Sequence, residues 1–214
     1  MSGREVLLVL SAPTGGGKTT IGRRLVELDG AIRFSVSHTT RPPRPGERDG
    51  ADYHFVDRAP FEAMAARGEF LEWAEVHGHL YGTHRQEAEA ARREGKDLLL
   101  DIDVQGGLQV KAARPDAVLV FILPPSLEVL LERLQRRGAE PGFDLARRLR
   151  TAEKELEKCG VYDYNIMNED LDRAVGQVRC ILEAARLRTP PGGAAGADLK
   201  RRITDWLRKR HVQG

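Results

Sequence analysis

A glycine-rich segment near the N-terminus constrains the fold of this chain more than any other feature. Residues 6–10 form a continuous apolar run, the pattern of a strand that is buried on both faces of a parallel sheet. Residues 12–19 follow with the sequence Ala-Pro-Thr-Gly-Gly-Gly-Lys-Thr, and apolar residues at helical spacing come next. A strand, this loop and a helix in that order predict a P-loop whose first glycine is replaced by alanine. We therefore expect an α/β protein that binds a nucleoside triphosphate.

Each residue type in this loop has a chemical task. Glycines allow backbone N–H groups to turn toward phosphates, Lys18 offers a mobile cation, and the Thr19 hydroxyl can ligate Mg²⁺. The N-terminus of the following helix adds partial positive charge. The residues expected to hold the triphosphate are Ala12, Pro13, Thr14, Gly15, Gly16, Gly17, Lys18, Thr19 and Thr20. The loop alone does not identify the reaction, because GTPases, ATPase motors and small-molecule kinases share it.

The rest of the chain alternates strand-length apolar runs with amphipathic segments. Such runs at residues 98–102, 118–123 and 164–167 favour strand–helix–strand units, with helices on both faces of a parallel sheet. The stretch from 35 to 94 differs, because it interleaves short alternating strands, expected at 34–37, 53–56 and 70–73, with turn-rich segments. We expect a core of residues 1–34 and 95–188 with a small mixed α+β lobe inserted at about 35–94.

Polar residues at the ends of predicted strands and helices allow two interpretations, ligand binding or helix capping. Asp101 ends a strand that is expected beside the P-loop strand, where ligands of such sheets bind, and such an aspartate commonly organises Mg²⁺. A helix N-cap is the alternative for Asp101 and for Asp103. Thr83 with Gln86 forms a capping box, and Ser126 is predicted to cap a helix whose apolar stripe starts at the next residue.

Composition and charge exclude several classes of protein. The 214 residues are 41% hydrophobic, and 34 Lys and Arg nearly balance 32 Asp and Glu, which argues against disorder and against a dedicated nucleic-acid binder. Two cysteines show neither a zinc nor a disulfide spacing, and the N-terminus carries no signal-peptide pattern. The longest apolar stretch, 117–123, is far below the roughly 20 residues of a membrane span. We expect a cytoplasmic protein without stable membrane association.

The segment from Phe34 to Glu47, Phe-Ser-Val-Ser-His-Thr-Thr-Arg-Pro-Pro-Arg-Pro-Gly-Glu, resembles the signature of the guanylate kinases, which transfer the γ-phosphate of ATP to GMP. Further matches run in family order between Glu5 and Arg188. They lie at residues 50–55, 70–73, 81–83, 101–106 and 121–126. The resemblance implies the P-loop nucleoside-monophosphate-kinase fold, a GMP-binding lobe at about 35–94 and a mobile helical lid at about 135–156. It also implies ATP as donor, GMP and dGMP as acceptors, Mg²⁺ as cofactor, and a place in purine nucleotide metabolism and GMP recycling.

The resemblance assigns the acceptor site to polar residues of the inserted lobe. Glu72 would accept hydrogen bonds from the N1–H and N2–H₂ donors of guanine, whereas adenine, with an acceptor at N1, would leave this carboxylate unpaired. Arginine forks in a proline-stiffened loop match phosphate oxygens, and tyrosine hydroxyls add neutral donors. The residues expected to bind GMP are Ser37, Arg41, Arg44, Tyr53, Glu72, Tyr81, Thr83, Asp101 and Asp103. Thr83 thus has a base-binding role beside its capping role, and both stay open here.

The catalytic residues implied by the resemblance carry positive charge. Lid arginines would close over the triphosphate and neutralise charge on the transferring phosphoryl group, and no general base is required. The expected catalytic residues are Lys18, Arg41, Arg137 and Arg148, and the expected metal ligands are Thr19 and Asp101.

Two alternative functions are compatible with parts of this sequence. Guanylate-kinase-like interaction modules share the fold but bind phosphorylated peptides, and they lack the P-loop lysine that this chain retains as Lys18. Another P-loop kinase, acting on a different nucleotide or a small alcohol, is disfavoured by Ser37, Glu72 and Thr83.

Residues 189–214 have the pattern of a Pro-Gly linker followed by a basic amphipathic helix. This helix could dock on anionic lipid, on its own core or on a partner subunit, and we favour docking within a homo-oligomer.

Overall fold

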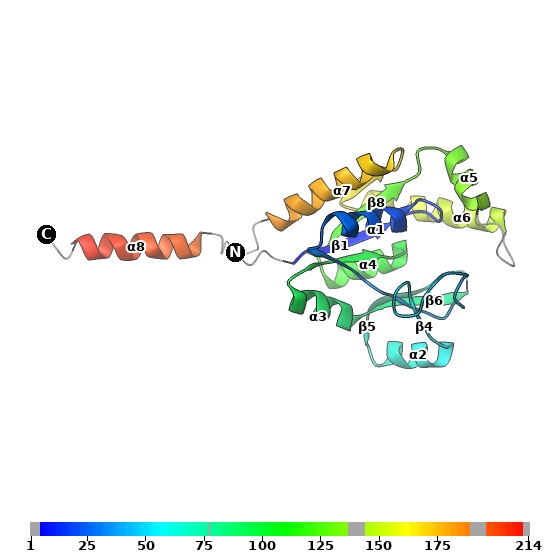
Figure 1. Cartoon of the computed structure of the whole chain (residues 1–214), viewed down its shortest axis with the longest axis horizontal. Helices are drawn as coiled ribbons and strands as arrows, with labels where there is room; N and C mark the ends of the chain where they lie inside the picture. The colour runs from blue at the N-terminus through cyan, green and yellow to red at the C-terminus, as the bar shows by residue number, and fades with distance from the viewer. Residues whose placement is uncertain (1–4, 77, 137–143, 189–195, 212–214) are drawn as a thin grey trace.

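The computed structural model describes residues 5–76, 78–136, 144–188 and 196–211. Its centre is a five-stranded parallel sheet with the order β2-β7-β1-β8-β9. Two of these strands, β1 and β8, are labelled in Figure 1. The strands are β1 (Leu7–Ser11), β2 (Ile32–Phe34), β7 (Asp97–Asp101), β8 (Val118–Leu123) and β9 (Tyr164–Met167). β1 lies in the middle and is buried along its whole length, as its continuous apolar sequence predicts. The expected parallel α/β core is therefore confirmed.

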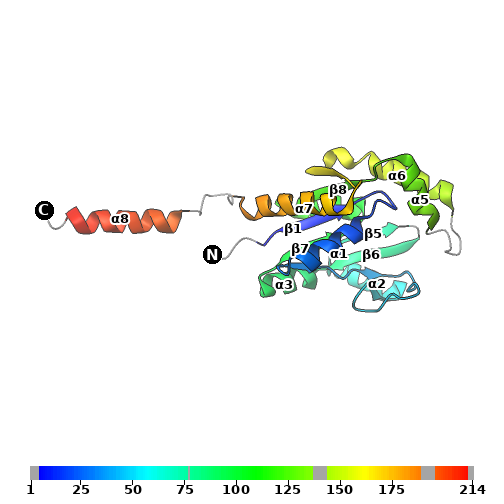
Figure 2. The same ribbon diagram turned by 45° about the horizontal axis from the view of Figure 1, so that its top comes forward.

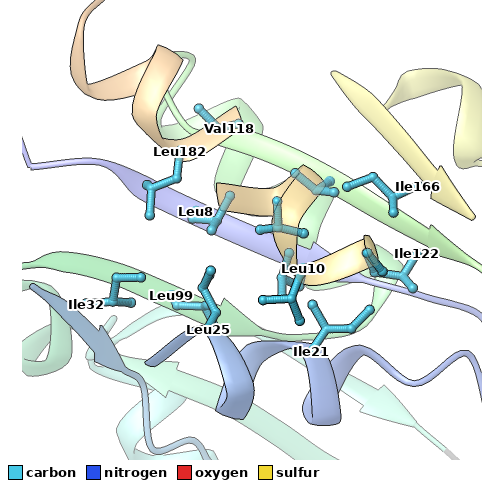
Figure 3. Close-up of a cluster of buried hydrophobic side chains, with 14 of the residues drawn as sticks. Leu8, Leu10, Ile21, Leu25, Ile32, Leu99, Val118, Ile122, Ile166 and Leu182 are labelled. Atoms are coloured by element: carbon cyan, nitrogen blue, oxygen red, sulfur yellow. The ribbon is translucent and has the colours of Figure 1, made fainter. Parts of the chain in front are cut away.

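Helices cover both faces of this sheet because alternate residues of β1 point to opposite sides. Leu8 and Leu10 pack with Ile21 and Leu25 of α1 (Lys18–Leu28) and with α7 (Leu171–Arg186), as Figure 3 shows. Leu7 and Val9 belong to a second apolar cluster on the other face. That cluster includes residues of α3 (Arg85–Glu94) and α4 (Val104–Ala113). These two clusters hold the strand that delivers the P-loop.

A second sheet is inserted in the chain between β2 and β7, and this confirms the expected mixed lobe. It has the order β4-β3-β6-β5. Its elements are β3 (His38–Thr39), β4 (His54–Phe55), α2 (Arg58–Ala66), β5 (Phe70–Val76) and β6 (His79–His84). Its small core contains Phe61 and Phe70, whose rings stack with centroids 4.5 Å apart. The expected strand at 34–37 is wrong, because Phe34 ends β2, which pairs with β7 in the main sheet.

The structure shows which of these residues cap helices. The capping box at Thr83 is wrong: His84 caps α3, and its Nδ1 accepts from the N–H of Gln86 at 3.2 Å. Asp103 caps α4 by accepting from the N–H of Gly106 at 2.8 Å, whereas Asp101 ends β7 and caps no helix. Thr83, relieved of capping, lies fully buried in β6.

The α5 (Leu127–Arg136) and α6 (Leu145–Leu156) helices pair through a small apolar cluster of Leu130, Leu134 and Ala152. Ser126 caps α5, as predicted, with its Oγ accepting from the N–H of Val129 at 3.3 Å. Leu127, by contrast, is 58% exposed, because the apolar stripe that packs begins one turn later. A 3₁₀ turn, Cys159–Val161, joins α6 to β9. Residues 137–143 of the expected lid lie outside the described residues.

The C-terminal helix α8 (Ala197–His211) extends away from the body in both ribbon views (Figures 1 and 2). Its apolar residues Leu199, Ile203, Trp206 and Leu207 are each about half exposed or more. None of the described helices is both long and apolar enough to cross a bilayer.

Candidate active site

The P-loop has the backbone geometry of a phosphate cradle. Gly15 and Gly17 adopt φ angles of 91° and 94°, in the left-handed region that glycine enters without steric cost. A side chain at Gly16 would collide with Ala12, so this tight turn also requires glycine. The loop leads from β1 directly into the N-terminus of α1, where no side chain caps the first turn. The first N–H groups of α1 therefore face the loop as a site for an anion.

Asp101 lies beside the P-loop because β7 pairs with β1, with Leu10 opposite Asp101. One carboxylate oxygen of Asp101 accepts from Lys18 Nζ at 2.5 Å, and the other accepts from Thr19 Oγ1 at 2.5 Å. A hydroxyl and a carboxylate are the hard oxygen donors that Mg²⁺ uses in small numbers, together with water and phosphate oxygens. The pair of Thr19 and Asp101 therefore has the donor chemistry that a magnesium ion requires, and binding of the ion there stays a prediction.

A single cavity runs from the P-loop to the inserted sheet. It brings together most of the residues that the sequence analysis singles out. The predicted residues among its lining are Ala12, Pro13, Thr14, Gly15, Gly16, Gly17, Lys18, Thr19, Thr20, Ser37, Arg44, Tyr53, Glu72, Tyr81, Asp101, Asp103 and Arg148. They come from parts of the chain that lie far apart in sequence, so the fold brings residues of both sheets together at one site.

Glu72 lies at the inserted-sheet end of this cavity and is only 4% exposed. An irregularity in the β5–β6 pairing between Phe70 and Glu72 sets Glu72 opposite Thr83, whose N–H donates to Glu72 Oε1 at 2.9 Å. The hydroxyls of Thr83 and Ser37 lie 3.3 Å apart. A side chain at Gly106 would collide with the Glu72 carboxylate. Three polar side chains thus form one buried hydrogen-bonding surface.

Burial raises the pKa of Glu72 to about 7; hydrogen bonds from Thr83 oppose this shift, and the nearby Asp103 carboxylate adds to it. The pKa of Asp103 is also raised, chiefly by burial and against the hydrogen bond from the Gly106 N–H and the charge of Lys18. Two carboxyl groups therefore lie at one end of the cavity at a considerable desolvation cost. Such perturbed acids in a cavity are typical of functional sites.

Arg41 and the two tyrosines form the wall beside β3. The rings of Tyr53 and Tyr81 lie 6.1 Å apart, and the Arg41 guanidinium lies 5.4 Å from the Tyr53 centroid. Arg41 Nη2 donates to both carboxylate oxygens of Glu47, at 2.9 and 3.0 Å. Arg44, Tyr53 and Tyr81 line the cavity, whereas Arg41 and Thr83 are not among its lining residues. Arg137 lies outside the described residues.

Sequence reasoning missed three residues that contact the P-loop. Glu155 of α6 lines the central cavity and accepts from the Thr14 N–H at 2.8 Å. Arg133 and Asn168 line a neighbouring hollow, and each donates to the carbonyl of Gly16, at 3.2 and 3.0 Å. No local pattern marks them, because they lie more than 100 residues from the loop in sequence.

The chain is similar to a known family of proteins along most of its length. A family model described as guanylate kinase matches residues 4–185. The chain belongs to the guanylate kinase family. It is 50% identical to a guanylate kinase of Aromatoleum aromaticum over 182 residues, which cover 85% of this chain and 89% of that protein. Enzymes of this family phosphorylate GMP to GDP with ATP, so the protein is a phosphotransferase of the nucleoside monophosphate kinase class.

Two further relatives extend the comparison. A guanylate kinase of Syntrophotalea carbinolica is 46% identical over 205 residues, which cover 94% of this chain and 98% of that protein. Residues 1–188 alone could not supply that share, so this alignment extends into the C-terminal segment. A crystal structure of guanylate kinase from Anaplasma phagocytophilum has a TM-score of 0.72 and 36% identity, and covers 88% of this chain and 91% of that one. The fold and the family are therefore shown by independent comparisons.

Proposed function

We propose that the central cavity binds the triphosphate of ATP at its P-loop end and GMP at its inserted-sheet end, so that the reaction of the family occurs between them. One observation carries the proposal: the same cavity is lined by the complete P-loop and by the buried group of Glu72 and Ser37. A phosphate cradle and a carboxylate aimed at a base edge fit two nucleotides that meet at their phosphates.

On the donor side, the P-loop N–H groups and the N-terminus of α1 bind the triphosphate. Lys18 leaves Asp101 to reach the transferring phosphate, and Arg148 approaches it from α6. Arg137 is proposed to act with Arg148 by its resemblance to the family. Thr19 and Asp101 would hold Mg²⁺, which neutralises charge on the phosphate oxygens when bound. The contribution of these side chains is to position the phosphates and to stabilise charge in the transition state.

On the acceptor side, Glu72 accepts from the N1–H and N2–H₂ groups of guanine, and Asp103 lies beside it for the same edge. Ser37 and Thr83 offer hydroxyls to the remaining polar atoms of the base. Arg44, Tyr53 and Tyr81 face the phosphate of GMP. Arg41 joins them when its Nη2 exchanges the two carboxylate oxygens of Glu47 for oxygens of the phosphate, because a guanidinium binds either anion.

A coupled phosphotransfer assay tests this function. The purified protein, with ATP and Mg²⁺, is offered GMP, dGMP, AMP, UMP or CMP in turn. We expect turnover of GMP, followed by dGMP, and little of the others, because only guanine presents two donors to Glu72. Turnover of AMP equal to that of GMP would contradict the assignment of Glu72. Absence of turnover with every nucleotide would favour the binding-module alternative.

The use of GMP is expected to depend on the ionisation of Glu72. Only the carboxylate accepts from both guanine donors, and burial raises the pKa of this group to about 7. The value of kcat/KM for GMP should therefore fall as pH drops through about 7, approaching a tenfold loss per pH unit well below it, because that ratio reports groups of the free enzyme. The measurement is a pH–rate profile between about pH 5.5 and 9. The inflection near 7 should be absent from Glu72→Gln, which should keep only the titration of the GMP phosphate, whose second pKa is about 6. An unchanged inflection near 7 in that variant would assign it to another group.

The C-terminal helix is proposed to pair with a second copy of the chain. Its apolar residues Leu199, Ile203 and Trp206 follow the 4-3 spacing of a helix–helix seam, and they are exposed in the isolated chain. Truncation after Arg188 is expected to convert an oligomer to a monomer in sedimentation velocity. The dissociation should be reproduced by Trp206→Asp in the full-length chain. Unchanged sedimentation of the truncated chain at all concentrations would contradict this proposal.

A cytoplasmic location is proposed on the family resemblance. None of the described helices could span a membrane.

A further inference from the structure

Glu155 connects α6 to the P-loop although 141 residues separate it from its partner. Its Oε2 accepts from the Thr14 N–H at 2.8 Å, and the Thr14 hydroxyl lies 3.4 Å from the same oxygen. Burial raises the pKa of Glu155 to about 7 against the hydrogen bond from Thr14, and the Asp103 charge raises it further. A carboxylate that is kept in a phosphate-binding cavity at this cost calls for an explanation, because phosphates repel it.

The position of Glu155 along α6 explains why a carboxylate is kept there. The next residue, Leu156, packs against the apolar cluster beneath the main sheet, whereas Ala152 and Leu149 pack against α5. Glu155 therefore lies where α6 passes from the body of the protein to the paired helices α5 and α6. A hydrogen bond at this junction fixes the helix relative to the P-loop.

Arg148 lies seven residues before Glu155 on the same helix. Seven residues make two turns, so both side chains share one face and are separated by about 10.5 Å along the axis. Both line the central cavity. Any rotation or shift of α6 at the Glu155 end thus moves Arg148 relative to the phosphates.

We propose that Glu155 is a positioning residue, whose hydrogen bond to the Thr14 N–H sets α6 on the P-loop so that Arg148 faces the transferring phosphate. This inference rests on the proposed function, in which Arg148 stabilises the transition state. Glu155 itself does not touch the reacting atoms. The length of its side chain, and a carbonyl-type acceptor at its tip, are what the role requires.

Two variants separate side-chain length from charge. Glu155→Asp keeps the charge but withdraws the acceptor by one methylene, so the link to Thr14 is lost. Glu155→Gln loses the charge but keeps the length and a carbonyl acceptor. We expect Glu155→Asp to lower kcat about tenfold or more, with KM for GMP within about twofold, because small misplacements of catalytic groups cost factors up to about 10². Glu155→Gln should stay within about threefold of the unmodified enzyme in kcat. Glu153→Ala, an exposed position of the same helix, is the matched control.

A double-mutant cycle with Arg148→Ala completes the test. Because Glu155 acts through Arg148, Glu155→Asp should lower the kcat of Arg148→Ala by less than about threefold more, whereas independent residues would multiply their effects. Multiplied effects, or a larger loss in Glu155→Gln than in Glu155→Asp, would overturn the inference. If Glu155→Asp kept full activity while Arg148→Ala was impaired, the inference about Glu155 would be overturned and the proposed role of Arg148 would stand. Full activity of Arg148→Ala would instead contradict the proposed role of the arginine on which it rests.

Discussion

Lys18→Ala is expected to lower kcat about 10²- to 10³-fold, the loss found when one preorganised donor to a developing charge is removed. Lys18 is the P-loop cation, and its Nζ donates to Asp101 at 2.5 Å. GMP binding should stay within about twofold, because most of the groups proposed for the base and its phosphate belong to the inserted lobe and not to the P-loop. Steady-state kinetics with calorimetric titration of GMP measure both quantities.

The control for this variant is Lys96→Ala, which removes a lysine that pairs with Glu94 outside the cavity. Its kcat should equal that of the unmodified protein. Loss of the lysine also removes a hydrogen bond to the Asp101 carboxylate, so the melting temperature of Lys18→Ala must be compared as well. A variant that folds, binds GMP and retains full kcat would show that Lys18 does not stabilise the transferring phosphate.

The donor half of the site could be predicted because it depends on short stretches of sequence. A buried strand, three glycines and a lysine specify the turn into α1 almost without reference to the rest of the chain. Asp101 could be added because parallel strands align their carboxyl ends, and the apolar run that precedes it identified its strand. Both predictions needed only local patterns and one rule about sheet topology.

The acceptor half could be predicted only through resemblance. Glu72 has no local mark, since an acidic residue beside Trp73 on a short strand is ordinarily exposed. What buries it is the β5–β6 pairing and the close approach of Gly106, which are tertiary contacts. The error at Thr83 has the same origin. A capping box and a hydrogen-bonding strand residue share one sequence pattern, and the position of the strand end, with His84 as the cap, decided between them.

Glu155 shows a further limit of sequence reasoning. On α6 it is one of two acidic residues among several basic ones, a pattern that normally indicates a solvated helix face. Only the packing of Leu156 and Ala152 turns this residue toward Thr14. Contacts between residues 141 positions apart leave no periodic signal, so the residue that links the two helices to the P-loop emerges from the structure alone.

Glu72→Ala is expected to lower kcat/KM for GMP about 10²- to 10⁴-fold, because it removes two hydrogen bonds to a charged group that contribute about 1.5–3 kcal/mol each. The affinity for ATP should hardly change, since Glu72 lies at the far end of the cavity from the loop that binds the triphosphate. The variant also leaves the Thr83 N–H without its acceptor, so a decrease in stability is expected and melting must be measured.

Discrimination, rather than rate alone, decides the role of Glu72. If the carboxylate reads the guanine edge, its loss should bring the kcat/KM values for GMP and AMP closer together, because the penalty that AMP suffers from an unpaired buried carboxylate disappears together with the advantage of GMP. Glu75→Ala, an exposed position of the same strand, is the matched control and should keep the preference intact. Equal losses for GMP and ATP in Glu72→Ala would instead mean that Glu72 supports the fold of the inserted sheet and does not select the base.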